Sequence, residues 1–153
     1  MGQGGLIEEE LTRSVIGAFF EVYNELGFGF AEHVHVRALS RELLSRGHRV
    51  ARELDVPVDY KGEFLCTQRI DVVVDNTLIV ETKSTEALPP TPMRQLQNYL
   101  RCTDIEIGLL LHFGPEPKFY RRFLPNSQKK SKNKNQITAL KNDMERMKRI
   151  QTG

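Results

Sequence analysis

The chain has few cysteines and no long apolar segment. Its two cysteines, Cys66 and Cys102, lie far apart and have no histidine at metal-ligand spacing. We therefore expect two reduced thiols and neither a disulfide nor a structural zinc site. The longest apolar runs, such as IGLLLHF, are far shorter than the roughly 20 residues that a membrane-spanning helix needs. No membrane partner is expected.

The N-terminal residues MGQGGLIEEEL lack the basic flank and the apolar core of a secretory signal. Together with the reduced thiols, this favours a cytoplasmic protein. A chain of 153 residues with 39% hydrophobic and 27% charged residues is typical of one domain with its own core.

The net charge of +2 conceals an asymmetry between the body and the C-terminal tail. Residues 126–153 contain eight basic and two acidic residues, whereas residues 1–125 contain 14 basic and 18 acidic ones. We predict a domain over 1–125, a basic linker over 126–136 and a short amphipathic helix over 137–153. Two interpretations of the tail stay open, a solvated appendage or a contact to a phosphate backbone. The candidate phosphate contacts of the tail are Lys129, Lys130, Lys132 and Lys134.

Hydrophobic spacing predicts the order of helices and strands in the body. Helical spacing covers 8–26, 31–45 and 93–102, and glycines follow the first two of these segments. Strands are predicted over 49–60, 63–75, 77–84, 105–114 and 118–125, and the fourth should be buried on both faces. This order predicts a mixed sheet flanked by helices, an α/β or α+β domain.

The segment RIDVVVDNTLIVETKS, residues 69–84, carries charged residues inside an apolar hairpin. A two-residue turn would place Asp71 opposite Val80, on the face away from Glu81. A three-residue turn over 75–77 would place Asp71 directly opposite Glu81, and Asn76 tolerates the left-handed backbone that this turn requires. We predict the three-residue turn. It brings the two carboxylates to about 5 Å at their Cβ atoms, with Lys83 on the same face.

Two carboxylates this close repel each other, so one must take up a proton or a cation must lie between them. A hard divalent ion takes oxygen ligands, and Asp71, Glu81 and the backbone carbonyl of Thr82 would supply three. The alternative is a salt-bridged cluster in which Lys83 neutralises the acids.

The pattern Asp71-x9-Glu81-x-Lys83 resembles the core motif of the PD-(D/E)xK nucleases. The segment from Gln95 to Tyr99 looks like the QxxxY motif of the RecB-like and Cas4-like branches. The segment GFGFAEHVH is similar to the opening motif of the GxxExxY proteins, a bacterial and archaeal branch of the same superfamily. The resemblance covers about residues 8–128 and implies a restriction-endonuclease-like fold. This chain has His35 where that branch has tyrosine.

The resemblance implies a metal-dependent nuclease that uses Mg²⁺ or Mn²⁺. Glu32, Asp71 and Glu81 would hold the ion, and Lys83 would hold the attacking water. Cleavage of a nucleic acid, DNA by this resemblance, would leave a 5′-phosphate and a 3′-hydroxyl.

The same resemblance implies that Gln95 and Tyr99 orient Lys83 or a substrate phosphate. Arg121 and Arg122 are further candidates for phosphate contacts, although a solvated edge strand explains them equally well. Two other functions stay open: a catalytically silent nucleic-acid-binding protein, and a protein-interaction module. In the latter, the C-terminal helix would bind a protein partner or a second copy of the chain.

Overall fold

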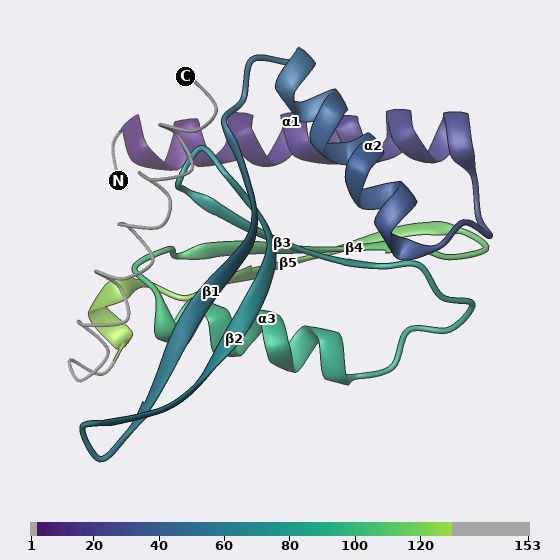
Figure 1. The fold of residues 1–153 in the computed structure, drawn as a ribbon. Coiled ribbons are helices and arrows are strands. Elements are labelled where there is room, and N and C mark those ends of the chain that lie inside the picture. Colours follow the sequence, from purple (N-terminus) through teal and green to yellow (C-terminus); the bar gives the residue numbers. More distant parts are fainter. Residues whose placement is uncertain (1–2, 130–153) are drawn as a thin grey trace, which may run out of the picture.

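The computed structural model describes residues 3–129, which form a five-stranded sheet between helices (Figure 1). The elements in chain order are α1 (Gln3–Leu26), α2 (Glu32–Ser45), β1 (Val50–Tyr60), β2 (Glu63–Val74), β3 (Leu78–Lys83), α3 (Thr91–Cys102), β4 (Ile107–Phe113), β5 (Pro117–Phe123) and the 3₁₀ turn η1 (Asn126–Gln128). The predicted order of helices and strands is confirmed, and so is the mixed, restriction-endonuclease-like sheet. Within residues 3–129, no helix combines the length and the apolar character needed to cross a bilayer.

The strands lie side by side in chain order, β1-β2-β3-β4-β5. All neighbouring pairs are antiparallel except β3 and β4, which are parallel because α3 connects them as a crossover. Every residue of β4 is buried, as predicted. The sheet is therefore mixed, and its apolar side chains are concentrated in the central strands.

Each face of the sheet has its own apolar core. On one face, α1 and α2 pack against alternate residues of the central strands, among them Val72, Val80 and Leu109. On the other face, α3 packs against the intervening residues, including Val73 and Ile79. Figure 1 shows α1 and α3 on opposite sides of the sheet. The alternation of strand side chains accounts for these two separate layers.

The differences from the predicted helix limits all concern N-termini, and for α2 the difference is a single residue. Helix α1 begins at Gln3, so Gly4 and Gly5 are helical. Helix α3 begins at Thr91 and includes Pro92 in its first turn. The first N–H groups of a helix have no partner inside the helix, so glycine and proline cost little there. The predicted helix over 137–153 and most of the predicted linker lie outside the described residues.

The turn between β2 and β3 has the predicted length. Val74 pairs with Leu78, Val73 with Ile79 and Val72 with Val80, which leaves residues 75–77 as the turn. Asp75 and Asn76 both adopt left-handed backbone angles, with φ of 52° and 55°. The next pair in this register is Asp71 and Glu81, so the two acids share one face of the sheet.

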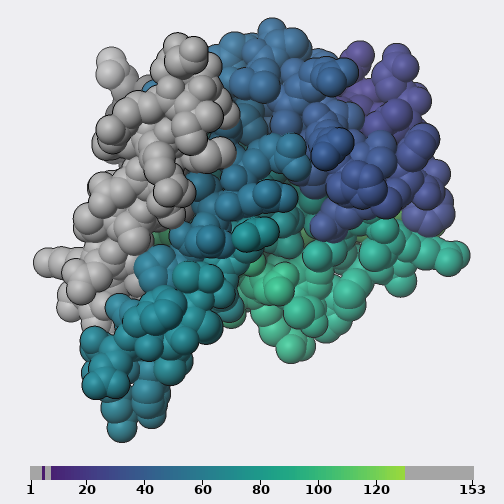
Figure 2. Space-filling view, viewed as in Figure 1, coloured from purple at the N-terminus to yellow at the C-terminus, as the bar shows by residue number. Residues whose placement is uncertain are grey.

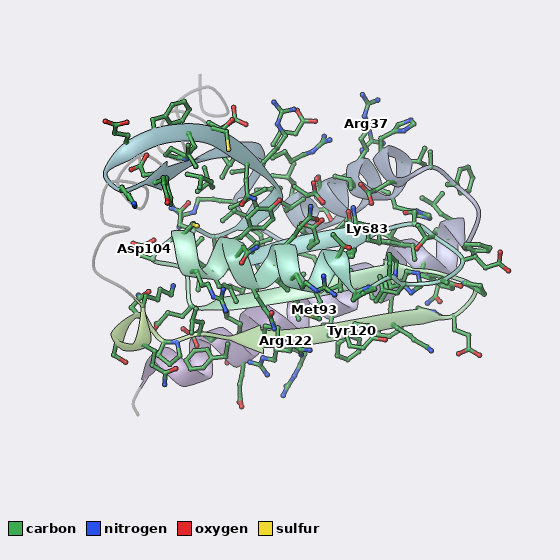
Figure 3. All side chains as sticks on the ribbon, turned by 90° about the horizontal axis from the view of Figure 1, so that it is seen from below. Arg37, Lys83, Met93, Asp104, Tyr120 and Arg122 are labelled. Atoms are coloured by element: carbon green, nitrogen blue, oxygen red, sulfur yellow. The ribbon has the colours of Figure 1, made fainter. Side chains whose placement is uncertain are left out.

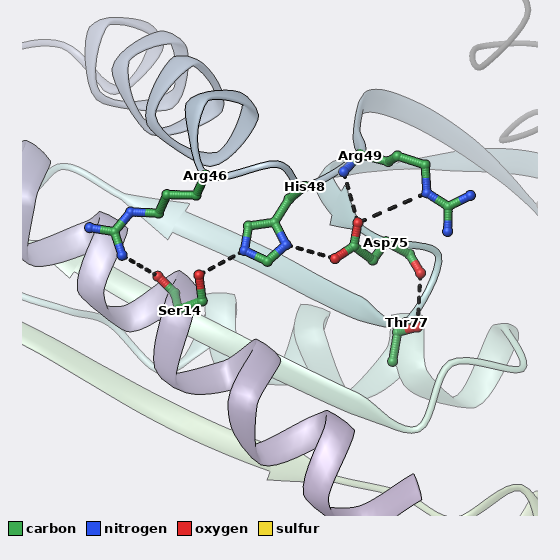
Figure 4. A network of polar contacts seen from close by, with 6 residues as sticks. All are labelled: Ser14, Arg46, His48, Arg49, Asp75 and Thr77. Carbon is green, nitrogen blue, oxygen red and sulfur yellow. Dashed lines mark hydrogen bonds and ion pairs between the residues drawn. The ribbon is translucent and has the colours of Figure 1, made fainter. Parts of the chain in front are cut away.

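A polar network ties this turn to α1 and to the loop before β1 (Figure 4). The Asp75 carboxylate accepts hydrogen bonds from the backbone N–H of Arg49 (2.8 Å) and from Nδ1 of His48 (2.7 Å). The other ring nitrogen of His48 lies 2.7 Å from the hydroxyl of Ser14. These bonds connect elements far apart in the sequence, so they help to fix the register that brings Asp71 opposite Glu81.

Asp75→Ala is expected to destabilise the fold by about 2 kcal/mol, because two charge-assisted hydrogen bonds disappear. Urea unfolding followed by circular dichroism measures this change. Asn76→Ala is the matched control, since Asn76 also has a positive φ but is exposed and makes no side-chain hydrogen bond within residues 3–129. An equal loss in both variants would show that backbone strain, and not the network, accounts for the effect.

Candidate active site

The charged residues of the hairpin gather where β2 and β3 begin to diverge. The regular pairing of these strands ends at Val72 and Val80, one position before Asp71 and Glu81. There the backbone N–H of Thr82 points to Oδ2 of Asp71 at 3.5 Å, a long contact in place of a further ladder bond. The divergence leaves room for side chains from α2 to reach the same place.

Glu32 arrives from the first turn of α2, after the loop GFGFA. Gly27 and Gly29 in this loop have φ of 68° and 117°, angles that few other residues adopt, and they let the chain turn between α1 and α2. Lys83 Nζ lies 3.7 Å from Oε1 of Glu32 and 3.7 Å from Oε1 of Glu81. Figure 3 shows Lys83 between α2 and α3. One ammonium group thus bridges two carboxylates from different elements.

Glu81 is the most deeply buried of these charged groups. It is 2% exposed, and its Oε2 has no hydrogen-bond partner among the described residues. Burial, and next the neighbouring Asp71 carboxylate, raise the pKa of Glu81 to about 8, although Lys83 opposes the shift. Burial and Asp71 also raise the pKa of Glu32, against the effect of Lys83. A proton or a cation at Glu81 would relieve this unfavourable charge.

The donor set fits a hard divalent cation, because it consists of carboxylate oxygens and one of them is buried without a partner. The predicted ligands Glu32, Asp71 and Glu81 do gather here. Within residues 3–129, however, no three acidic, histidine or cysteine side chains already stand at metal-ligand spacing around one point. The side chains as they lie form the salt-bridged cluster of the alternative prediction, centred on Lys83.

Comparison with known proteins identifies the family of this chain. Residues 9–123 match the sequence profile of the PD-(D/E)XK nuclease superfamily. The chain belongs to that superfamily. A search of curated proteins finds no significant match.

Two solved structures resemble the chain in fold. The crystal structure of SSO0001 is 18% identical with a TM-score of 0.48, and the match covers 90% of this chain and 67% of the other. An alkaline exonuclease from Laribacter hongkongensis is 16% identical with a TM-score of 0.43, and the match covers 78% of this chain and 70% of the other.

Within this PD-(D/E)XK chain, Tyr99 and Gln95 lie on α3 but differ in their contacts. The Tyr99 hydroxyl donates a 2.6 Å hydrogen bond to the carbonyl of Arg69, two residues before Asp71. Burial, and then Glu81 and Asp71, raise the pKa of Tyr99 to about 12, so this hydroxyl keeps its proton. Gln95 is partly exposed, and its side chain makes no hydrogen bond to another described residue. Tyr99 thus contacts the β2 backbone beside Asp71, whereas the Gln95 side chain is available to bind another molecule.

His35, which replaces the tyrosine of the GxxExxY pattern, is fully buried behind the charged cluster. Its Nε2–H donates to the carbonyl of Gly27 (2.9 Å), so Nδ1 accepts from the hydroxyl of Ser84 (2.6 Å). Its ring stacks on Phe113 with the centroids 4.1 Å apart. Burial lowers the pKa of His35, which keeps the ring neutral in this tautomer. Histidine here joins the loop before Glu32 to the residue after Lys83.

His35→Phe is expected to lower the free energy of unfolding by about 2 kcal/mol, because the Gly27 carbonyl and the Ser84 hydroxyl lose their partner. Chemical denaturation measures this loss. A nuclease assay of the same variant measures the loss of activity that a displaced Lys83 would cause. His33→Phe, two residues away on an exposed position, should change stability by no more than about 0.5 kcal/mol. Equal effects of the two substitutions would contradict the positioning role of His35.

Glu53 is an acidic residue near the site that the sequence patterns did not single out. It occupies the position of β1 that faces Asp71, between the pairs Arg52↔Val72 and Leu54↔Ile70. Its φ is 55°, unusual within a strand, and it lines a cavity of about 120 Å³ together with Glu32 and Asp71. A signal was present in the sequence, because two adjacent charged residues, Arg52 and Glu53, interrupt the apolar alternation between Ala51 and Leu54.

The three candidate phosphate contacts within the described residues, Lys129, Arg121 and Arg122, do not gather at the acidic cluster. Lys129 Nζ donates to the carbonyls of Thr103 (2.8 Å) and Ile105 (2.6 Å), so two of its three N–H donors bind the fold, and its phosphate contact stays a prediction. Burial lowers the pKa of Lys129 to about 8. Arg121 and Arg122 lie on the edge strand β5, and Figure 3 shows Arg122 well away from Lys83. Lys130, Lys132 and Lys134 lie outside the described residues.

Proposed function

We propose that this chain is a metal-dependent nuclease that hydrolyses phosphodiester bonds in DNA and leaves a 5′-phosphate and a 3′-hydroxyl. Membership of the PD-(D/E)XK nuclease superfamily supports the class of reaction. The observation that carries the proposal is the approach of Lys83 to Glu32 and Glu81, next to Asp71. The GFGFAEHVH motif and the Gln95–Tyr99 pair favour the GxxExxY branch within the superfamily.

The proposed ligands of the metal ion, Mg²⁺ or Mn²⁺, are Glu32, Asp71, Glu81 and the backbone carbonyl of Thr82. When bound, the ion would neutralise the phosphodiester and lower the pKa of a water molecule. Three carboxylates alone would repel a phosphate, and the unpartnered Oε2 of Glu81 supports a cation in this position.

Lys83 has the charge and the reach to act on the attacking water and on the phosphate. Its ammonium offers three N–H donors and lies 3.7 Å from both Glu32 and Glu81, at ion-pair rather than hydrogen-bond distance. In the proposed reaction it donates to the oxygen that attacks phosphorus and stabilises the charge that develops on the phosphate. The bond from the water oxygen to phosphorus forms as the bond from phosphorus to the 3′ oxygen breaks, and a proton from the water ends on the 3′ oxygen, which leaves a phosphate on the 5′ end and a hydroxyl on the 3′ end.

Tyr99 and His35 act as positioning residues in this proposal, and Gln95 is the group on α3 that is available to a substrate phosphate. Tyr99 holds β2 two residues before Asp71, and His35 holds Ser84 directly after Lys83. These contacts fix the two strands from opposite sides of the cluster. Such support keeps catalytic groups within the narrow geometry that the reaction demands.

Incubation with supercoiled plasmid and with single-stranded DNA, in Mg²⁺, in Mn²⁺ or in EDTA, tests the proposed reaction. Cleavage with either ion that EDTA abolishes supports it, and end-labelling identifies the 5′-phosphate. Tight binding without cleavage would indicate the catalytically silent alternative. Absence of both would leave the protein-interaction module.

A further inference from the structure

An open groove of about 630 Å³ runs between α2 and β1, the edge strand of the sheet. The helix contributes residues spaced three or four apart, which form one stripe along α2, and the strand contributes three more. Figure 2 shows α2 and β1 on the same face of the molecule. The lining residues are Arg37, Ser40, Arg41, Leu44, Val50, Arg52 and Glu53.

The groove lining carries more positive than negative charge. Arg37 and Arg41 also line a neighbouring pocket with Glu21, Glu25 and Glu42, but they form no ion pair of 4.0 Å or shorter with these acids. Arg37, Arg41 and Arg52 have no ion pair or hydrogen bond from their guanidinium groups to any other residue within 3–129. By contrast, Arg46, Arg49 and Arg69 each pair with a carboxylate. Glu53 is the one acid in the groove lining, so three guanidinium groups face one carboxylate. Figure 3 shows the Arg37 side chain extending outward from α2.

Two polar atoms of the groove lining are buried without a partner. Ser40 is 6% exposed and its hydroxyl makes no hydrogen bond, and Arg52 Nε likewise has none within the described residues. A buried donor without an acceptor costs free energy, and native proteins rarely keep one without a reason. The Arg52 Nε–H can only donate and the Ser40 hydroxyl can also donate, so an anion that reached both atoms would satisfy them.

The groove leads to the proposed catalytic residues. Arg52 and Glu53 line both the groove and the smaller cavity that contains Glu32 and Asp71. From Glu32 to Leu44 the helix rises roughly 18 Å. At 3.4 Å per nucleotide in one strand of a duplex, this length corresponds to about five nucleotides.

We propose that the groove between α2 and β1 binds the phosphates of the substrate strand and delivers a neighbouring phosphodiester to Asp71, Glu81 and Lys83. This proposal rests on the proposed function. Under this proposal, residues of the domain over 1–125 attract the DNA, although this domain has more acidic than basic residues in total. Guanidinium groups suit this purpose because they bind phosphate oxygens in a bidentate manner and stay charged.

The test measures binding of a fluorescein-labelled 20-nucleotide DNA, single-stranded and duplex, by fluorescence anisotropy in EDTA at several salt concentrations. Arg37→Gln/Arg41→Gln should weaken binding about tenfold, as expected for the loss of two partly exposed ion pairs. The slope of log affinity against log salt should fall by about two, because two phosphate contacts are lost. Both arginines are exposed, so the variant should fold normally. Ser40→Ala should also weaken binding without lowering thermal stability.

Arg13→Gln/Lys118→Gln is the matched control, because it removes two exposed positive charges from α1 and β5, outside the groove. It should keep the salt slope of the wild type to within about half a unit. Equal slopes in the two double variants, or no DNA binding by the wild type, would overturn the groove proposal. Normal binding through the groove without any metal-dependent cleavage would instead overturn the nuclease proposal and leave the groove intact.

Discussion

Lys83→Ala is expected to lower the rate of DNA cleavage on the order of a thousandfold. Lys83 Nζ lies 3.7 Å from each of two carboxylates, Glu32 and Glu81, and no second lysine or arginine contacts either of these acids within residues 3–129. Its removal deletes the donor to the attacking water and the positive charge next to the phosphate. Cleavage of a labelled oligonucleotide under single-turnover conditions measures the loss.

The control for this substitution is Lys118→Ala, which removes an exposed lysine on β5. It should retain the wild-type rate. DNA binding by Lys83→Ala should stay near the wild-type level, because the proposed binding groove lies between α2 and β1. If Lys83→Ala cleaves within a few-fold of the wild type, Lys83 has no part in the reaction.

Glu81→Gln is expected to change activity and stability in opposite directions. Cleavage should fall on the order of a thousandfold, because a neutral amide is a poor ligand for a divalent cation. The melting temperature of the metal-free protein should rise by about 5 °C or more at pH 8, because glutamine is neutral where the carboxylate is buried. Differential scanning calorimetry in EDTA measures the second effect.

The sign of this stability effect follows from the pKa of Glu81, which burial raises from 4.5 to about 8. The folded protein binds this proton more tightly than the unfolded chain does. The wild type should therefore lose stability as the pH rises from about 4.5 to 8, whereas the variant lacks this contribution. The two melting temperatures should nearly coincide at pH 5 and differ most at pH 8 and above.

Glu86→Gln is the matched control, since Glu86 is an exposed carboxylate in the loop after β3. Its melting temperature should follow that of the wild type across this pH range. Addition of Mg²⁺ should stabilise the wild type and Glu86→Gln but not Glu81→Gln. A melting temperature of Glu81→Gln below that of the wild type at pH 8 would show that the buried carboxylate is not a source of instability.

Local patterns predicted the fold because each element carries its own signal. The apolar run of β4 and the helical spacing of α1 depend on neighbouring residues alone, and both were found. The strand register that brings Asp71 towards Glu81 was also predictable, because it depends only on the length of one turn and on the tolerance of Asn76 for a positive φ. The ends of helices were harder to predict from the sequence. Pro92, for example, lies in the first turn of α3, outside the predicted helix.

The contacts around the site depend on tertiary packing, which local patterns do not encode. Glu32 reaches Lys83 only because α2 packs beside the end of β3, and its place in the site came from the family resemblance. The partner of the Tyr99 hydroxyl is a backbone carbonyl, which has no sequence signature. The groove lined by Arg37, Arg41 and Arg52 forms only because α2 and β1, two separate elements, lie next to each other in the fold.

A crystal of the protein soaked in Mn²⁺, with anomalous diffraction recorded at the manganese edge, shows whether this cluster binds a divalent ion. We expect the carboxylates of Glu32, Asp71 and Glu81 to hold the ion where the Lys83 ammonium now lies. The predicted result is an anomalous peak within bonding distance of Asp71 and Glu81, with the Lys83 ammonium displaced from at least one carboxylate. If no peak lies there at saturating Mn²⁺ and Lys83 still bridges Glu32 and Glu81, these carboxylates do not form a metal site.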